Sequence, residues 1–190
     1  MTAEPIRDMK ALKEFAEHYL KRGQLRNHTL IVMGLNTALR ISDLLSLKWE
    51  DLYDFERNVF REHFTLVEGK TRKTKTIALN KAALSALSTY FPHRNGAFIF
   101  PNNRASADPI NRTQAHRIIK TAARNNRAAI HVSCHSLRKT FGYHAWKAGV
   151  TVVLLMDIYN HSDYNITRKY LGISQDELDA VYKEVVLGTK

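Results

Sequence analysis

The sequence contains a tyrosine whose neighbours could support covalent chemistry on a phosphate. Tyr170 lies nine residues after His161, and Arg168 and Lys169 precede it directly. A tyrosine hydroxyl becomes a nucleophile when it loses its proton, and histidine can hold oxygens or move protons near neutral pH. A structural interpretation, in which Tyr170 is an aromatic anchor at a helix end, is equally open on this segment alone.

Two arginines lie in segments that could bind a phosphate. Arg40 is embedded in the apolar stretch TALRISDLLSL, where an unpaired buried guanidinium would be costly, and Asp43, three residues on, could be its partner on one helical face. His135 and Arg138 are also three residues apart, in HSLRKTFGYHAW, and could reach one oxygen-rich group. Taken separately, these segments also fit a structural Arg40–Asp43 pair and a surface His135–Arg138 pair.

A basic turn, EGKTRKTK, lies between two segments rich in β-branched and aromatic residues. Its cations are Lys70, Arg72, Lys73 and Lys75. Such a run is typical of a solvated hairpin tip, but it could also be a flexible finger that reaches into DNA. A lysine on a mobile turn could then protonate the leaving 5′ oxygen of a phosphodiester.

Together these side chains supply the groups that metal-free phosphoryl transfer requires. Two arginines can clamp the nonbridging oxygens, and a covalent phosphotyrosine would conserve the energy of the broken strand without ATP. The spacing of His131, Cys134 and His135 does not match paired zinc ligands, and neither a glycine-rich phosphate loop nor a two-magnesium carboxylate cluster is evident. We therefore expect no metal and no cofactor.

Composition points to a polyanionic partner. The chain of 190 residues has 29 Lys and Arg against 18 Asp and Glu, which gives a net charge of +11 and a pI near 9.8. This balance is typical of nucleic-acid-binding proteins. Three features favour a cytoplasmic protein without membrane contact: the single cysteine, the lack of an apolar run near the roughly 20 residues of a membrane span, and an N-terminus unlike a signal peptide.

Apolar periodicity predicts a mainly helical chain. Helices are expected at residues 8–21, 27–36, 41–47, 81–90, 111–125, 135–147, 151–159, 163–170 and 175–187. The segments NVFREHFTLVEG and TKTIALN predict one short antiparallel sheet, and SQDE has the spacing of a capping box for the last helix. The expected fold class is α+β, mainly α-helical with a small antiparallel β-sheet.

The order of these motifs resembles the tyrosine recombinase (phage integrase) family, from about Pro5 to Val186. TALRISDLLSLKWEDL is similar to its first arginine box, VEGKTRKTKTIAL to its lysine hairpin, HSLRKTFGYHAWKAG to its second box and NHSDYNITRKYLG to its tyrosine segment. The resemblance implies the fold of the family's catalytic domain. It also implies catalytic roles for Arg40, Lys70, His135, Arg138 and His161, a nucleophilic Tyr170 and a supporting Asp43, with Lys73 as the alternative lysine. The resemblance further implies a bacterial or phage protein that associates with the nucleoid and has double-stranded DNA as its partner. DNA contacts are expected at Arg72, Lys73, Lys75 and Lys139.

Three positions depart from the usual family pattern. Ala38 stands where glycine is frequent, Lys139 where many members have histidine, and Asn160 where glycine precedes the second histidine. Asparagine tolerates the left-handed backbone that glycine favours, so we expect His161 to keep its place.

The resemblance also implies a domain organisation and an assembly. Residues 1–190 correspond to the catalytic domain, without the usual N-terminal core-binding domain, so the sequence is either a fragment or a naturally short member like the fimbrial-switch invertases. The apolar stripe of DELDAVYKEVVLG could dock on its own domain or on a neighbour. We expect a homo-oligomer, a tetramer on DNA, formed by exchange of C-terminal helices, with accessory DNA-bending proteins as further partners.

The expected function is site-specific DNA recombination (integration, excision or inversion), of the kind found in mobile elements, through a covalent 3′-phosphotyrosine. The alternatives are a type IB topoisomerase-like enzyme that relaxes DNA and a non-catalytic DNA-binding regulator with the same fold.

Overall fold

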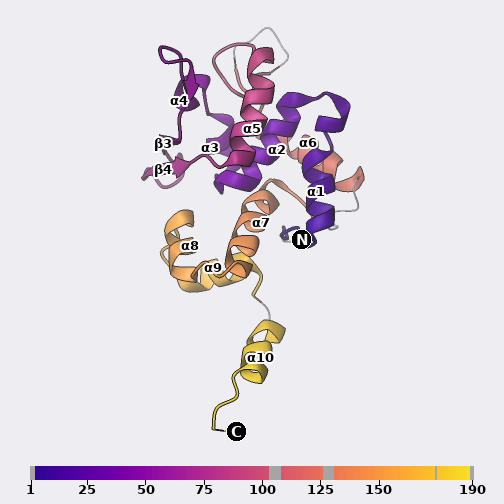
Figure 1. Cartoon of the computed structure of the whole chain (residues 1–190), viewed down its shortest axis with the longest axis vertical. Helices are drawn as coiled ribbons and strands as arrows, with labels where there is room; N and C mark the ends of the chain where they lie inside the picture. Colours follow the sequence, from indigo (N-terminus) through magenta and orange to yellow (C-terminus); the bar gives the residue numbers. More distant parts are fainter. Residues whose placement is uncertain (1–2, 103–107, 126–130, 174, 189–190) are drawn as a thin grey trace.

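The computed structural model describes residues 3–102, 108–125, 131–173 and 175–188, and it is mainly helical (Figure 1). The helices are α1 (Met9–Glu17), α2 (Leu25–Thr37), α3 (Ile41–Leu45), α4 (Trp49–Leu52), α5 (Lys81–Tyr90), α6 (Arg112–Asn125), α7 (Cys134–Lys147), α8 (Val152–Tyr159), α9 (Tyr164–Leu171) and α10 (Gln175–Glu184). Two 3-10 turns follow α1 and α5, at Leu20–Arg22 and Phe91–His93. The predicted α+β class is confirmed, and Ser174, predicted to cap α10, lies outside the described residues.

The strands form two separate antiparallel ribbons where the sequence predicted one sheet. The first pairs β1 (Tyr53–Asp54) with β2 (Val59–Phe60), and the second pairs β3 (His63–Val67) with β4 (Thr74–Ala78). In the second ribbon Phe64 pairs with Ile77, and both side chains are buried on the face that packs on the helices. Side chains alternate across a strand, so this register decides which residues of the hairpin point toward the protein body.

Two hydrophobic clusters hold the elements together. The larger is built around α2, α3, α5 and α6, and it fixes the segment that carries Arg40. The smaller joins Ala38 to Leu155, Tyr159 and Leu171, so it ties α8 and α9 to the start of α3. Gly142 allows this close approach, because a side chain there would overlap the Tyr159 hydroxyl. The segments bearing His161 and Tyr170 are thereby packed against α7.

Several boundaries differ from those predicted. The first helix ends at Glu17, and α3 ends at Leu45 before a short helix, α4, that the sequence analysis did not predict. The last helix, α10, extends away from the rest of the molecule (Figure 1), and its Val181 and Tyr182 are exposed. The described apolar side chains of this stripe therefore do not dock on their own domain in this structure. None of the helices in the described ranges is long and apolar enough to cross a membrane.

Candidate active site

Arg40 lies at the N-terminal end of α3 and forms an ion pair across the site. Its backbone is extended (φ −67°, ψ 148°), and it follows Ala38, whose φ of 52° is left-handed. Arg40 Nη1 is 2.7 Å from Glu68 Oε2, and the Glu68 side chain is fully buried. The predicted pairing of Arg40 with Asp43 is therefore wrong. Arg40 precedes the first helical residue, so the two side chains do not share a helical face.

Asp43 supports the hairpin. Its carboxylate is buried on α3, and Oδ1 accepts a hydrogen bond from the backbone N–H of Gly69 at 3.1 Å. Gly69 directly precedes Lys70, so Asp43 fixes the root of the basic turn. We therefore retain the supporting role of Asp43 as a proposal, with the hairpin in place of Arg40 as its target.

Arg138 enters the same site from α7. Its side chain is buried, Nη1 donates to the Ala38 carbonyl, and Nη2 donates to the Tyr159 carbonyl at 2.7 Å. These bonds join the end of α2 to the end of α8. A guanidinium has five N–H donors, so donors beyond the two in these bonds can serve an anion.

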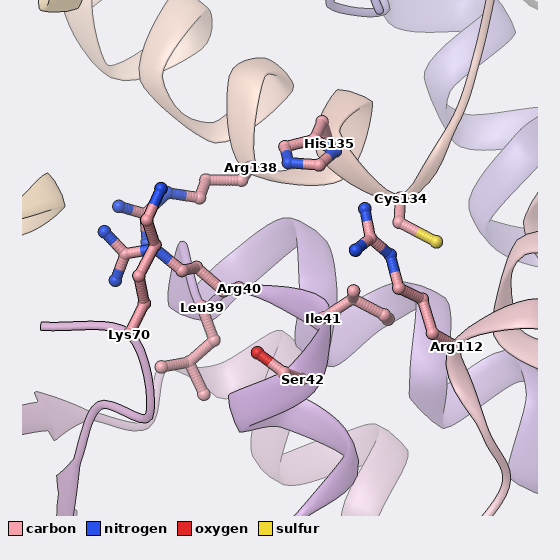
Figure 2. Close-up of a pocket in the computed structure, with 9 residues that line it drawn as sticks. All are labelled: Leu39, Arg40, Ile41, Ser42, Lys70, Arg112, Cys134, His135 and Arg138. Atoms are coloured by element: carbon pink, nitrogen blue, oxygen red, sulfur yellow. The ribbon is translucent and has the colours of Figure 1, made fainter.

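A pocket of about 360 Å³ connects the arginines to the basic turn (Figure 2). It is lined by Leu39, Arg40, Ile41, Ser42, Lys70, Arg112, Cys134, His135 and Arg138. The charged ends of Arg40, Lys70 and Arg138 gather at one side of it, and Arg112 lies across from them near His135 and Cys134 (Figure 2). Partial burial, followed by the charges of Arg112 and Arg138, lowers the pKa of His135. The pocket is thus rich in cations and suited to an anion.

His161 and Tyr170 lie together beside Arg138. Their ring centroids are 5.4 Å apart, and the Tyr159 ring is 5.1 Å from each of them. Asn160 adopts the predicted left-handed backbone (φ 52°), which ends α8 and presents His161. His161 Nδ1 lies 3.0 Å from Thr167 Oγ1 of α9, so α9 orients the imidazole as well as carrying the tyrosine.

The surroundings of Tyr170 and His161 keep both side chains neutral. Burial raises the pKa of Tyr170, although the nearby Arg138 guanidinium lowers it in part. Burial, helped by the charges of Arg138 and Arg40, lowers the pKa of His161 to about 4. A neutral imidazole can accept a proton, so it lies in a suitable form next to a protonated phenol.

The phage integrase family profile matches residues 6–177, which is most of the chain. The chain belongs to this family. Phage integrase family members are tyrosine recombinases, which cleave and rejoin DNA. "Probable integrase/recombinase YoeC" of Bacillus subtilis (strain 168) is 33% identical over 184 residues, which cover 95% of this chain and 95% of YoeC.

Solved structures show the same fold. The XerA recombinase superposes with a TM-score of 0.76 at 17% identity, over 96% of this chain and 64% of XerA. XerH bound to palindromic difH substrate superposes with a TM-score of 0.74 at 17% identity, over 96% of this chain and 54% of XerH. This chain thus spans little more than half of XerH, and the matched region has the fold of a tyrosine recombinase catalytic domain.

The predicted DNA-contact residues occupy different surroundings. Arg72 and Lys73 are exposed at the turn between β3 and β4, as a DNA contact requires. Lys75 instead turns inward, where its ammonium donates to the Ile158 carbonyl at the end of α8. Burial, with the charge of Arg138, lowers the pKa of Lys75 to about 8. Lys139 is half-buried, with Nζ 5.2 Å from the centroid of the Tyr170 ring. The expectation of DNA contact thus does not fit Lys75 in this structure.

Sequence analysis missed two residues of the site. Glu68 is the only acid between Val67 and Leu79, and an isolated acid in a basic run was the available signal. Arg112 is the first residue of α6, a helix whose sequence, RTQAHRIIKTAARN, contains four Lys and Arg and no acid. That one-sided charge could have indicated an anion-facing helix.

His161 offers a test of the site in the protein without DNA. We expect the His161 imidazole to titrate near pH 4 in an NMR titration, because burial and two arginines disfavour its cation. The folded-state pKa lies below the ordinary value of 6.5, so this contribution to stability is present above pH 6.5 and decreases as the pH falls toward 4. Arg40→Ala should raise the His161 pKa. A midpoint at or above 6.5 in the unchanged protein would contradict this electrostatic description.

Proposed function

We propose that the protein is a site-specific DNA recombinase that cuts and rejoins duplex DNA through a 3′-phosphotyrosine on Tyr170, for integration, excision or inversion. The observation that carries the proposal is that Tyr170 and His161 lie together beside Arg138. The charge of Arg40 also lowers the pKa of both Tyr170 and His161. These groups come from four separate segments, and family membership supports the same activity.

The proposed reaction proceeds by an in-line displacement at phosphorus. The Tyr170 oxygen forms the new bond to phosphorus, and its proton passes to the neutral His161 or to solvent. Arg40, Arg138 and His135 hold the nonbridging oxygens as negative charge develops there, and bidentate guanidinium contacts suit that geometry. The 5′ oxygen leaves with a proton from Lys70. Rejoining reverses these steps.

The proposed DNA-binding surface extends beyond this pocket. Arg72 and Lys73 at the hairpin tip lie on one side, and the exposed basic residues of α6 begin with Arg112, which lines the pocket itself. The further exposed basic side chains of α6 are His116, Arg117, Lys120 and Arg124. The superposed XerH structure is a DNA complex, which supports duplex DNA as the partner.

We further propose that the C-terminal segment docks on a second copy. Its exposed apolar residues are Val181, Tyr182, Val185, Val186 and Leu187. A groove of about 520 Å³ between α1, α2 and α7 is lined in part by Met9, Leu12, Phe141 and Ala145, and could receive them. Exchange of C-terminal segments in this way fits a tetramer on DNA. The proposal includes DNA-bending proteins as accessory factors, and it places the protein in the cytoplasm, where the DNA lies. In this proposal residues 1–190 act as the catalytic domain.

The deciding experiment is covalent trapping on a suicide substrate. A duplex from the DNA flanking the gene, nicked just beyond the scissile phosphate, releases a short oligonucleotide on cleavage and prevents rejoining. We expect a protein–DNA adduct that resists denaturant, and peptide mapping should place the DNA on Tyr170.

Two further outcomes separate the alternatives. Relaxation of a supercoiled plasmid without any recombinant product would favour the topoisomerase-like enzyme. Specific binding without any adduct, on a site the protein demonstrably occupies, would favour the regulator.

Lys70 is expected to act as the acid for the leaving oxygen. Lys70→Ala should slow cleavage strongly, and a substrate with sulfur in place of the 5′ bridging oxygen should restore the rate, because a thiolate leaves without a proton. Single-turnover rates on both substrates would measure this rescue. Lys73→Ala is the matched control on the same turn. Rescue of Lys73→Ala in place of Lys70→Ala would move the role to Lys73.

A further inference from the structure

Glu68 is a fully buried carboxylate that receives three donors on one oxygen. Glu68 Oε2 lies 2.7 Å from Arg40 Nη1 and accepts hydrogen bonds from Thr71 Oγ1 at 2.7 Å and from Asn160 Nδ2 at 2.8 Å. A buried charge is stable only when it is paired and hydrogen-bonded, and Oε2 of Glu68 meets both conditions, whereas Oε1 is buried without a hydrogen-bond partner among the described residues.

The three donors belong to three different parts of the site. Arg40 is itself a proposed phosphate ligand, Thr71 follows Lys70 on the basic turn, and Asn160 precedes His161. Glu68 thus contacts Arg40 directly, and it also contacts the residues adjacent in sequence to Lys70 and His161.

We infer that Glu68 is a positioning residue of the active site, which holds Arg40, the Lys70 turn and the His161 loop in register for the scissile phosphate. This inference rests on the proposed function. Glu68 does not touch DNA, because it is covered by the residues it binds. It acts through Arg40 and through the two segments that flank it.

The chemistry of the Arg40–Glu68 ion pair favours a positioning role for Glu68. Burial raises the pKa of Glu68, but the hydrogen bonds from Thr71, Asn160 and Arg40 together lower it to about 2, so it remains a carboxylate at working pH. The ion pair between Arg40 Nη1 and Glu68 Oε2 restricts where the guanidinium lies, and the other N–H groups of Arg40 are left to face an incoming anion. The Glu68 side chain has no solvent-exposed surface, so bulk water does not compete for these donors.

Asn160 provides one of the hydrogen-bond donors to the buried Glu68 carboxylate. Its left-handed backbone would suit glycine, yet its side-chain amide is used as a donor to Glu68. Asp43 provides a second link at the next residue, through the Gly69 N–H. The root of the hairpin is therefore attached to α3 on one side and to the end of α8 on the other.

Glu68→Gln tests the inference because glutamine keeps the shape but loses the charge. At saturating DNA we expect the single-turnover cleavage rate to fall by about 100-fold, since small displacements of reacting groups have effects of that size. The dissociation constant for DNA should stay within about twofold, because Glu68 is not on the binding surface. Glu62→Gln, an exposed acid just before the same hairpin, is the charge-matched control and should cleave like the unchanged protein.

A double-mutant cycle distinguishes positioning from a general structural effect. If Glu68 acts largely through Arg40, Glu68→Gln should cost less than about tenfold in an Arg40→Ala background, in contrast to its effect alone. Full additivity of the two losses would overturn the positioning of Arg40 by Glu68. Equal loss of DNA affinity and rate would also overturn it.

A second variant and a second measurement keep the test independent of folding and of cleavage. Asn160→Gly keeps the left-handed backbone and removes one hydrogen-bond donor to Glu68, and we expect a several-fold slower cleavage rate without loss of DNA affinity.

In the protein without DNA, the Arg40 side-chain NH resonances should show restricted guanidinium rotation that Glu68→Gln releases. If the unchanged protein forms no adduct, the proposed function fails and the NMR result still decides whether Glu68 positions Arg40. Unrestricted rotation in the unchanged protein would refute that positioning.

Discussion

Tyr170→Phe is expected to abolish the covalent protein–DNA adduct while DNA binding stays unchanged. Phenylalanine keeps the ring that packs on Tyr159 and His161 but lacks the oxygen that would attack phosphorus. Loss of a covalent nucleophile typically lowers turnover by about 10⁴-fold or more. Denaturing gels with the nicked suicide duplex measure the adduct, and a mobility-shift titration measures binding.

The other tyrosines near the C-terminus serve as controls. Tyr164→Phe and Tyr182→Phe remove exposed hydroxyls from α9 and α10, and both proteins should form the adduct at the normal rate. An adduct of undiminished yield from Tyr170→Phe would show that another residue is the nucleophile. Weakened binding by Tyr170→Phe alone would instead indicate that the hydroxyl contributes to DNA binding, because phenylalanine keeps the ring.

Arg40→Ala is expected to have the second-largest effect. Removal of one donor to a developing oxyanion commonly lowers the rate by about 100- to 1000-fold. The substitution also leaves the buried Glu68 carboxylate without its cation, so we expect a lower melting temperature as well. Single-turnover cleavage and thermal unfolding on the same preparation separate the two consequences.

Arg40→Lys and Arg57→Ala make this prediction specific. Lysine restores a positive charge beside Glu68 but cannot bind phosphate in a bidentate manner, so stability should recover more than the cleavage rate. Arg57 is exposed on the turn between β1 and β2, and its removal should leave cleavage unchanged. A cleavage rate for Arg40→Ala within threefold of normal would remove Arg40 from the mechanism.

Helices and motif positions could be predicted because their signals are local. Apolar spacing identified α2, α5, α6, α7, α8 and α9, and the Asn160 backbone followed from the conformational tolerance of asparagine. The acid partner of Arg40 could not be found in this way. The i, i+3 rule favoured Asp43, but it applies only when both residues are helical, and Arg40 stands before the first turn. Glu68 reaches Arg40 only through the placement of the hairpin.

The inward orientation of Lys75 follows from the alternation of side chains along a strand, which the charge pattern alone does not reveal. Lys75 and Ile77 are two residues apart on β4, so they point to the same face, and Ile77 is buried. A basic run suggests solvent and DNA at every position, whereas strand alternation divides it between two faces. The separate β1–β2 ribbon was missed because strands of two residues are too short to produce a pattern.

The packing of Tyr170 against His161 and Tyr159 of its own chain has a consequence for mixed assemblies. A single polypeptide brings the phenol that we propose as the nucleophile and both guanidinium groups to one place. In a mixture of copies that lack the phenol and copies that lack a guanidinium, the two kinds of copy would therefore not complement each other. No pairing of such copies would give one chain that holds the phenol and both guanidinium groups.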